Sequence, residues 1–539
     1  MEAVLPTNIN YLDTLPRAVP SERKRRNFFA ANGTQYRCGQ TIIIEVGDPR
    51  AFLDPAQSFL RFTLTNNSGA QSCNLDFGGG ACLLKNFRVQ QGGNTILNIQ
   101  EYARLYNSII APTTGGKNFK SSTSIYQQNI AYGTSTQAAA ANVNTPEPGA
   151  TCVGPTICAA QCPSINNLML ANGGGEAQCC VPLVGGLFSQ DKLLPLPLVN
   201  QSQPIQLIFD LEAINNLGVW TGAPVNTDIL ISNVRYCAQM VEVPRDVLGF
   251  LRQQQEAHGG ALVVQASSYE HQGQTLAEGA TGTQILEIPS RKRSIKSVQF
   301  VCMANPLTIA QFAATAGSGL PAGVGVHSVY NLSCSKNPCL VSYQLRAGSL
   351  VMPPTAIRGP GGRQNGVVNP SAGTAAVAGL PNQFANRGEA CFEVSRAVGH
   401  LDSMIGLGSE STLTYCNNVD NTGTNWVMGQ GQAGVGLDRI TGPSGLLGAY
   451  GAAADGYMWA FSPFMIDLEA YQNQAVMSGL DTKSLSLQMQ LHLELANDRS
   501  TAGTGAAAGG QSTAFEVDIY TYHDVMYYFN SDGQITYSD

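Results

Sequence analysis

Five cysteines lie close together in the sequence and are the side chains best placed to bind a metal ion or to form disulfides. They are Cys152, Cys158, Cys162, Cys179 and Cys180. A structural zinc site normally uses paired C-x-x-C knuckles, and this spacing does not supply them. Thiols stay free in a reducing compartment and pair in an oxidising one. We therefore expect a cluster of free thiols, with disulfides formed after release as the alternative, and no metal site.

The second chemical feature is the densest run of positive charge in the chain, formed by Arg23, Lys24, Arg25 and Arg26. The segment before it contains Pro6, Pro16 and Pro20, and proline disfavours regular structure. We therefore expect residues 1–40 to form an N-terminal arm. Three interpretations of the basic run are open: a solvated tail, a nuclear import signal, or a contact with a polyanion or a neighbouring subunit.

Motifs typical of enzymes give little support to catalysis. Gly429–Gly434 matches G-x-G-x-x-G, but a dinucleotide site needs a strand before this motif and a helix after it. The flanking residues are loop-like, so we interpret the match as a glycine-rich surface loop. Neither H-E-x-x-H nor G-x-S-x-G occurs, and His492 lies on the polar face of an expected strand. We expect no catalytic residue, no cofactor and no small-molecule substrate.

The elements around these residues are predicted to be β-strands. Apolar residues alternate with polar ones from Leu485 to Leu495, and a second alternating strand begins at Phe515. Such a period of two buries one face of a sheet and leaves the other wet. A similar strand–loop–strand unit occurs half a chain earlier, in 205–211 and 229–243. The sequence therefore predicts two similar all-β units in tandem.

This pattern predicts an all-β protein of two tandem jelly-roll β-barrels, with long loop insertions and a few short helices. The expected helices lie at 99–110, 245–256 and 391–405, and the longest loops at 113–193 and 421–456. The expected divisions are an N-terminal arm (1–40), a first jelly roll (41–243), a linker (244–259), a second jelly roll (260–530) and a C-terminal tail (531–539).

The composition fits a packed assembly better than a freely diffusing enzyme. Apolar residues make up 43% of the 539 residues, whereas charged residues make up only 12%, about half the usual share. The net charge of −7 argues against a chain that binds nucleic acid through its overall charge. We see neither a signal peptide nor an apolar run of the ~20 residues that span a bilayer, and expect synthesis in the cytosol or nucleoplasm.

Several blocks resemble one family. Phe52-Leu53-Asp54-Pro55 followed by 58–63 looks like the start of the first barrel in double jelly-roll major capsid proteins. The group that it resembles is that of small eukaryotic double-stranded DNA viruses, the polinton-like viruses and virophages. The further blocks that are similar to this family are 231–243 with 261–269, 342–348 and 466–482.

The resemblance implies a homotrimer whose six barrels form a pseudo-hexagonal capsomer of an icosahedral shell. It implies neighbouring capsomers, minor capsid proteins and penton proteins as partners. From its positive charges, the N-terminal arm is expected to contact the genome, an inner membrane or a neighbouring subunit. The expected location is the virion, after synthesis in the host cytoplasm, with assembly in the nucleus or the cytoplasm left open. The alternatives are a carbohydrate-binding or carbohydrate-active protein on a tandem β-sandwich, and a cell-surface array protein.

Overall fold

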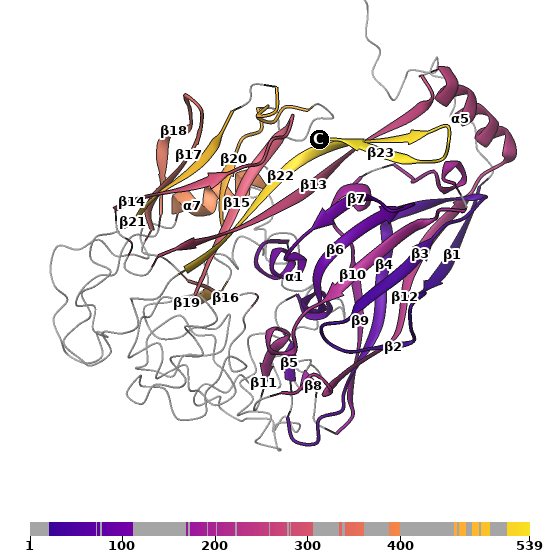
Figure 1. Cartoon of the computed structure of the whole chain (residues 1–539), viewed down its shortest axis with the longest axis horizontal. Coiled ribbons are helices and arrows are strands. Elements are labelled where there is room, and N and C mark those ends of the chain that lie inside the picture. Colours follow the sequence, from indigo (N-terminus) through magenta and orange to yellow (C-terminus); the bar gives the residue numbers. More distant parts are fainter. Residues whose placement is uncertain are drawn as a thin grey trace, which may run out of the picture.

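The computed structural model shows two β-sandwiches lying side by side (Figure 1). The structure describes residues 21–110, 169–304, 332–359, 388–398, 458–495 and 515–539, with short gaps at 72, 76–77, 171–172, 191, 201, 221–223, 258, 278–279, 281, 333, 337–339, 461–462, 471–476 and 485–486. The first sandwich comes from the N-terminal half of the chain and the second from the C-terminal half.

The first sandwich consists of two antiparallel four-stranded sheets and one added short strand. Its first sheet has the order β1 (Glu22–Phe29), β12 (Ile229–Glu242), β4 (Ala51–Asn66) and β9 (Gly175–Pro182), and β2 (Gln35–Tyr36) also pairs with β12. Its second sheet has the order β3 (Thr41–Val46), β10 (Ile205–Leu211), β6 (Leu84–Gln91) and β7 (Asn94–Ile99).

The second sandwich repeats this plan. One sheet has the order β13 (Ala261–Leu276), β22 (Phe515–Asn530), β15 (Ile295–Ala304) and β20 (Phe464–Asp467), and β23 (Ile535–Ser538) also pairs with β22. The other sheet has the order β14 (Gly282–Ile288), β21 (Met489–Leu495), β17 (Leu340–Ala347) and β18 (Leu350–Arg358).

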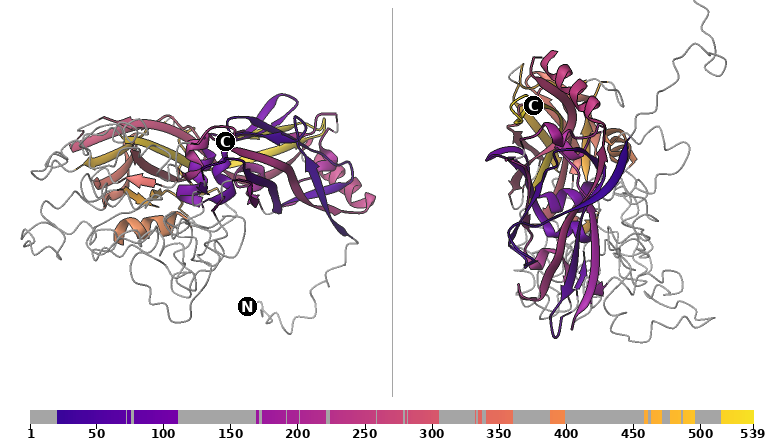
Figure 2. Two further views of the ribbon diagram at one scale, coloured as in Figure 1. Left: turned by 90° about the horizontal axis from the view of Figure 1, so that it is seen from below. Right: turned by 90° about the vertical axis from the view of Figure 1, so that its right-hand side faces the viewer.

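Smaller elements complete the described parts. Two small sheets are formed by β11 (Gly218–Trp220), β5 (Cys73–Leu75) and β8 (Met169–Leu170), and by β16 (Cys334–Lys336) and β19 (Met458–Ala460). The helices are α1 (Tyr102–Leu105), α5 (Arg245–Ala257) and α7 (Gly388–Ala397), with a π-helical turn at Tyr106–Ile110 and 3-10 turns at Gly79–Leu83, Gly186–Phe188, Leu196–Leu198 and Ile214–Asn216. Figure 2 shows α7, in orange, outside the sheets of the second sandwich. The three helices overlap the three predicted segments.

Both sandwiches have the same connectivity. When the eight main strands of each are numbered along the chain, one sheet has the order 1-8-3-6 and the other 2-7-4-5. Eight antiparallel strands in these two sheets make a jelly roll. The repeated sequence unit corresponds to strands 7 and 8 of each roll, β10 with β12 and β21 with β22. The all-β prediction of two tandem jelly rolls is therefore confirmed.

The hydrophobic cores show that the rolls are not independent. One core fills the first roll and includes Phe87 and Phe209, whose rings stack at 5.1 Å, and another fills the second roll around Phe300 and Phe464. Side chains from the far ends of β13, β22 and β23 belong to the first core: Val264, Ala266, Val525, Tyr527, Phe529 and Ile535. The long strands of the second roll therefore extend over the first and help to fill its core (Figure 1).

The structure corrects three predicted boundaries. The expected arm was wrong for 22–36, because β1 is the first strand of the first roll and β2 pairs with β12. The C-terminal tail was also wrong, because β23 pairs with the end of β22. The loop expected over 113–193 contains the sixth strand of the roll, β9. Residues 1–20 and 421–456 lie outside the described residues.

Candidate functional surfaces

The basic run lies on β1, the edge strand of the first sheet. β1 pairs along its whole length with β12, and its residues 22–27 are exposed while Phe28 is buried. Successive side chains of a strand point to opposite faces. Arg23 and Arg25 therefore lie on the outer face of the sheet, and the other two basic residues lie on the side of Phe28.

Three of the four basic side chains have carboxylate partners within the chain. The ion pairs are Arg23 with Asp54, Lys24 with Glu22 and Glu242, and Arg26 with Asp48. Lys24 donates hydrogen bonds to the carboxylates of Glu22 and Glu242, and these bonds raise the pKa of Lys24 above its ordinary value. Arg25 differs, because its guanidinium lies over the ring of Phe59 at 5.1 Å and forms no ion pair with the described residues.

The charge on β1 has a structural consequence that follows from its position. An edge strand exposes unpaired backbone groups, and charged side chains there prevent another strand from adding to the sheet. Exposed ion pairs of this kind contribute only about 0–1 kcal/mol each to stability. The sequence contains no period-two signal for this strand, because residues 22–27 are all charged or polar and none of them alternates with an apolar residue.

Of the five clustered cysteines, the structure describes two. Cys179 and Cys180 are consecutive residues of β9, so Cys179 is buried in the core and Cys180 lies half-buried on the outer face. Burial raises the pKa of both thiols. Cys152, Cys158 and Cys162 lie outside the described residues. Because Cys179 and Cys180 point to opposite faces of the sheet, these two neighbouring thiols cannot share one site.

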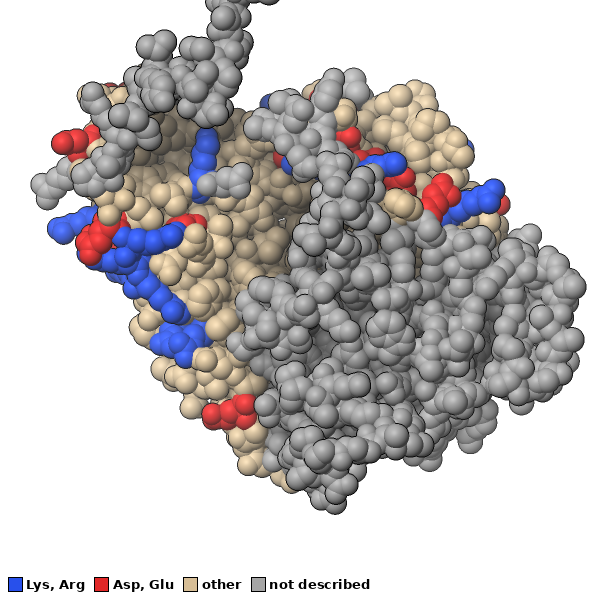
Figure 3. All heavy atoms as spheres, turned by 180° about the vertical axis from the view of Figure 1, so that it is seen from behind, with Lys and Arg blue, Asp and Glu red and all other residues tan. Residues whose placement is uncertain are grey.

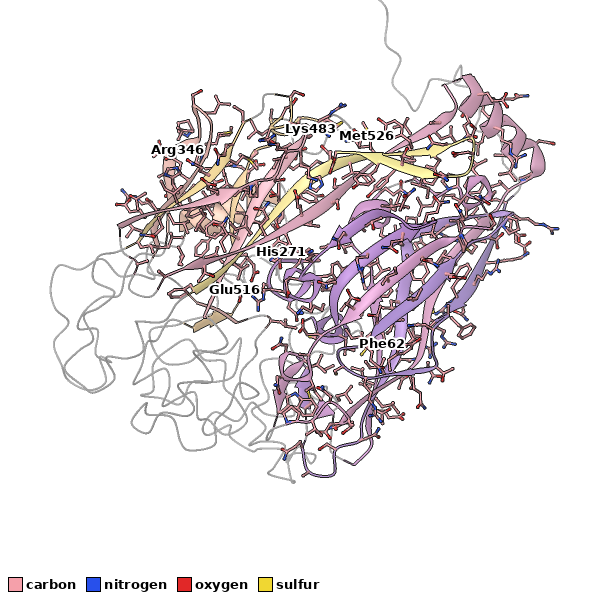
Figure 4. The ribbon with its side chains drawn as sticks, viewed as in Figure 1. Phe62, His271, Arg346, Lys483, Glu516 and Met526 are labelled. Carbon is pink, nitrogen blue, oxygen red and sulfur yellow. The ribbon has the colours of Figure 1, made fainter. Side chains whose placement is uncertain are left out.

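The junction between the rolls contains a buried ionic cluster that the sequence did not reveal. Arg104 of α1 pairs with Asp518 of β22, and the other oxygen of that carboxylate lies 2.7 Å from Nε2 of His271 on β13. The side chains of these three residues are only 8%, 1% and 9% exposed. Burial alone would raise the pKa of Asp518, but Arg104 and His271 outweigh it, and the pKa is lowered. Figure 4 labels His271 and Glu516 at this junction.

Other hydrogen bonds fix the rolls to each other. The Tyr520 hydroxyl donates to the carbonyl oxygen of Glu101 at 3.0 Å. The Gln91 amide donates to the Gly533 carbonyl at 2.7 Å and accepts from the Ile535 N–H at 2.8 Å. These side chains and backbone groups come from opposite ends of the sequence. We call this set, together with Arg104, Asp518 and His271, the inter-roll joint.

Comparison with solved structures supports the same architecture over nearly the whole chain. The crystal structure of PBCV-1 VP54, fitted into a reconstruction of the virophage Sputnik, matches with a TM-score of 0.51 and 9% identity, covering 98% of each chain. The chain has a double jelly-roll fold. The quasi-atomic model of the PBCV-1 capsid gives a TM-score of 0.49 at 10% identity, again covering 98% of each chain. The Sputnik virophage structure gives 0.47 at 10% identity, covering 100% of this chain and 93% of that chain.

Neither a family model nor a curated protein sequence matches the double jelly-roll chain. At 9% identity the likeness to the solved structures establishes the shared fold. The predicted boundary at residue 41 was too late because of the strand pairing in this chain. A complete first roll needs eight main strands, and β1 supplies the first of them.

Within the described part of the double jelly-roll chain, no group of three or more His, Cys, Asp or Glu side chains is arranged to hold a metal ion. His492 projects from β21, where burial and the charge of Arg346 lower its pKa. The G-x-G-x-x-G segment lies outside the described residues. None of the described helices is long and apolar enough to cross a bilayer.

Proposed function

We propose that the chain is a structural protein, the major capsid protein of an icosahedral double-stranded DNA virus. Three copies form a pseudo-hexagonal capsomer, and capsomers pack side by side into the shell. The proposal is supported by the fold shared with PBCV-1 VP54, a structure that has been fitted into a virophage reconstruction. The resemblance of the first-barrel segment at 52–63 supports it independently of the coordinates.

The observation that carries the proposal is the duplication of one roll within a chain whose two rolls share buried contacts. Both rolls have the same strand order, and the inter-roll joint fixes one to the other through buried polar and apolar contacts. A chain with two similar rolls presents two similar sides, so three copies around a three-fold axis present six. A weakly charged surface permits close lateral packing, because few charged groups must be desolvated.

The proposal also defines the partners. These are the two other copies in the trimer, neighbouring capsomers, and the minor capsid and penton proteins that complete a shell. The protein acts in the virion after synthesis in the host cytoplasm, and it needs neither a catalytic residue nor a cofactor.

Electron microscopy of the recombinant full-length chain tests this function. We expect particles with a six-sided outline and three-fold symmetry, each built from three chains, and shells or flat arrays of them at high concentration. Monomeric particles that bind glycans would instead support the carbohydrate-binding alternative. The R104A and K24A variants provide a comparison. R104A removes a contact of the inter-roll joint and should give poorly ordered capsomers, whereas K24A changes only the exposed edge and should give normal capsomers.

A further inference from the structure

The inter-roll joint brings together two particular parts of the jelly-roll plan. The first roll contributes the hairpin of its strands 4 and 5, β6 and β7, through the side chain of Gln91. The second roll contributes the segment after its strand 8, because Gln91 bonds the backbone of Gly533 and Ile535, which follow β22. Within the chain, the hairpin of strands 4 and 5 of one roll therefore meets the segment after strand 8 of the other.

Each roll also has the counterpart of the part that the other roll contributes. The counterpart of the β6–β7 hairpin is the β17–β18 hairpin, and the counterpart of the segment after strand 8 is α5, which follows β12. Figure 1 shows these two counterparts at opposite ends of the molecule, with β18 at the outer end of the second roll and α5 beyond the first. The hairpin of one chain therefore cannot reach the helix of that chain, whereas it can reach the helix of another copy.

The two hairpins differ in the polarity of their exposed tips. Both have turns of two residues, so Asn94 and Thr95 of the first are equivalent to Leu350 and Val351 of the second. The first tip exposes the two polar residues, whereas the second exposes two apolar side chains, at 45% and 36%. β18 is also an edge strand of its sheet. An exposed apolar strand at a sheet edge is a site of association, and we call residues 350–351 the hairpin tip.

A second exposed apolar surface lies at α5. Phe250 of this helix is 59% exposed, and Val263 of β13, a strand that α5 contacts, is 47% exposed. The side-chain amide of Gln255 donates to the carbonyl oxygen of Phe529 at 2.8 Å, which holds the helix against the end of β22. Phe529 itself packs in the core of the first roll. The surface at α5 is therefore continuous with the contact between the rolls.

We propose that the hairpin tip (350–351) of one copy packs against Phe250 and Val263 of the next copy. This inference rests on the proposed capsomer and names the surfaces through which its copies meet. Each copy gives a hairpin to one neighbour and receives a hairpin from the other, and heterologous contacts of this kind can close into a ring.

The placement of the two surfaces favours a second copy as the occupant. A lipid surface would account for exposed apolar side chains, but not for their presence at the two positions whose counterparts meet within the chain. Seen from behind, most of the described surface is uncharged, and basic and acidic side chains gather over the first roll (Figure 3). Few charged groups must therefore be desolvated when copies pack together.

Sedimentation equilibrium of full-length variants at micromolar concentration tests this contact. L350D/V351D places charges on the hairpin tip, and F250D places one on the helix. Because the substituted side chains are exposed, both variants should keep the wild-type free energy of unfolding while the mass falls threefold, from trimer to monomer. The matched control is I285D on β14, which alters a side chain that is 53% exposed but lies outside both surfaces, and it should stay trimeric.

A mixture of the two defective variants tests the pairing itself. The intact hairpin of F250D can bind the intact helix of L350D/V351D, but no ring can close, so we expect complexes of two chains. A monomeric wild type would contradict the proposed capsomer. A trimeric wild type whose variants also stay trimeric, a mixture without complexes, or equal loss in I285D would overturn this contact alone. Binding of the trimer to phosphatidylcholine vesicles that F250D abolishes would also overturn it, because the helix would then face a membrane.

Discussion

The first strands of the two rolls occupy the same place in the fold but have opposite roles. β1 is short, and in it only Phe28 is buried. β13 pairs with β22 along its whole length, from Ala261 opposite Asn530 to Leu276 opposite Phe515, and also carries His271 of the inter-roll joint. The two rolls therefore share one strand order, but their first strands differ in what they contact. The outward side chains decide whether the first strand faces water, as β1 does, or the other roll, as β13 does. In the first roll this position ends the sheet, and in the second it connects the rolls.

This difference has a consequence for stability. The ends of β13 and β22 supply apolar side chains to the core of the first roll, so unfolding of the second roll would expose part of that core. Domains that share buried surface in this way are expected to unfold together, as a single cooperative unit.

The largest effects should come from matched cavities in the two cores. Phe209 stacks on Phe87 in the first roll, and Phe300 stacks on Phe464 in the second at 5.2 Å. F209A and F300A should each reduce the free energy of unfolding by about 4 kcal/mol, because a large buried ring is replaced by a cavity. In urea denaturation, each variant should shift the same single transition. Two transitions, with each variant shifting only one, would show that the rolls are independent.

Mutations in the inter-roll joint should reduce the free energy of unfolding by nearly as much. D518N removes the charge that Arg104 and His271 surround, and breaking a buried ion pair costs about 3 kcal/mol or somewhat more. The control is the R104M/D518L double variant, which removes both charges and should recover most of the loss. Chemical denaturation of the single and double variants measures the difference. A loss below about 1 kcal/mol for D518N would mean that the joint is not held by this pair.

A third prediction concerns pH. Burial and the nearby Lys292 lower the pKa of His523 from 6.5 to about 4. Between these values the unfolded chain binds a proton that the folded chain does not, so stability rises with pH and is lost as pH falls from 6.5 toward 4. The loss should approach about 3 kcal/mol, at about 1.4 kcal/mol per pH unit. The pKa of Asp518 is lowered from 3.8, so its contribution is lost at still lower pH.

The H523Q variant isolates this effect. Its free energy of unfolding, measured at several pH values from 7 to 4, should vary less with pH than that of the wild type. An identical slope in both proteins would assign the acid sensitivity to other groups.

The smallest effects should come from the exposed ion pairs of β1. R23Q should change the free energy of unfolding by less than about 1 kcal/mol, and K24Q should leave it nearly unchanged, because water screens both pairs. Added salt should reduce the difference further. Thermal unfolding at low and high salt checks this, and a loss comparable to that of D518N would contradict the view of β1 as an edge strand.

Local patterns predicted the strands but not their long-range partners. Apolar and polar residues alternate in β21 and β22, and the same alternation occurs in β10 and β12. This alternation is enough to predict strands with one buried face, so it indicated two similar β units. β1 was missed because its four cations resembled a solvated tail. Their carboxylate partners at Asp48, Asp54 and Glu242 become neighbours only when the sheet forms.

The inter-roll joint lay beyond sequence reasoning for the same reason. Arg104 and Asp518 are 414 residues apart, and each is an ordinary charged residue in its own segment. Only the packing of one roll on the other buries both and makes their pairing necessary. The proposed contact between copies is a similar case, because the β17–β18 hairpin and α5 lie at opposite ends of the molecule (Figure 1).

The central claim is that three copies of this two-roll chain form one pseudo-hexagonal capsomer. Sedimentation equilibrium of the purified full-length protein at micromolar concentration tests it most directly. The account predicts a single species with three times the 57.0 kDa mass of the chain, which persists on dilution. A species of 57.0 kDa that forms no trimer as concentration rises would contradict it.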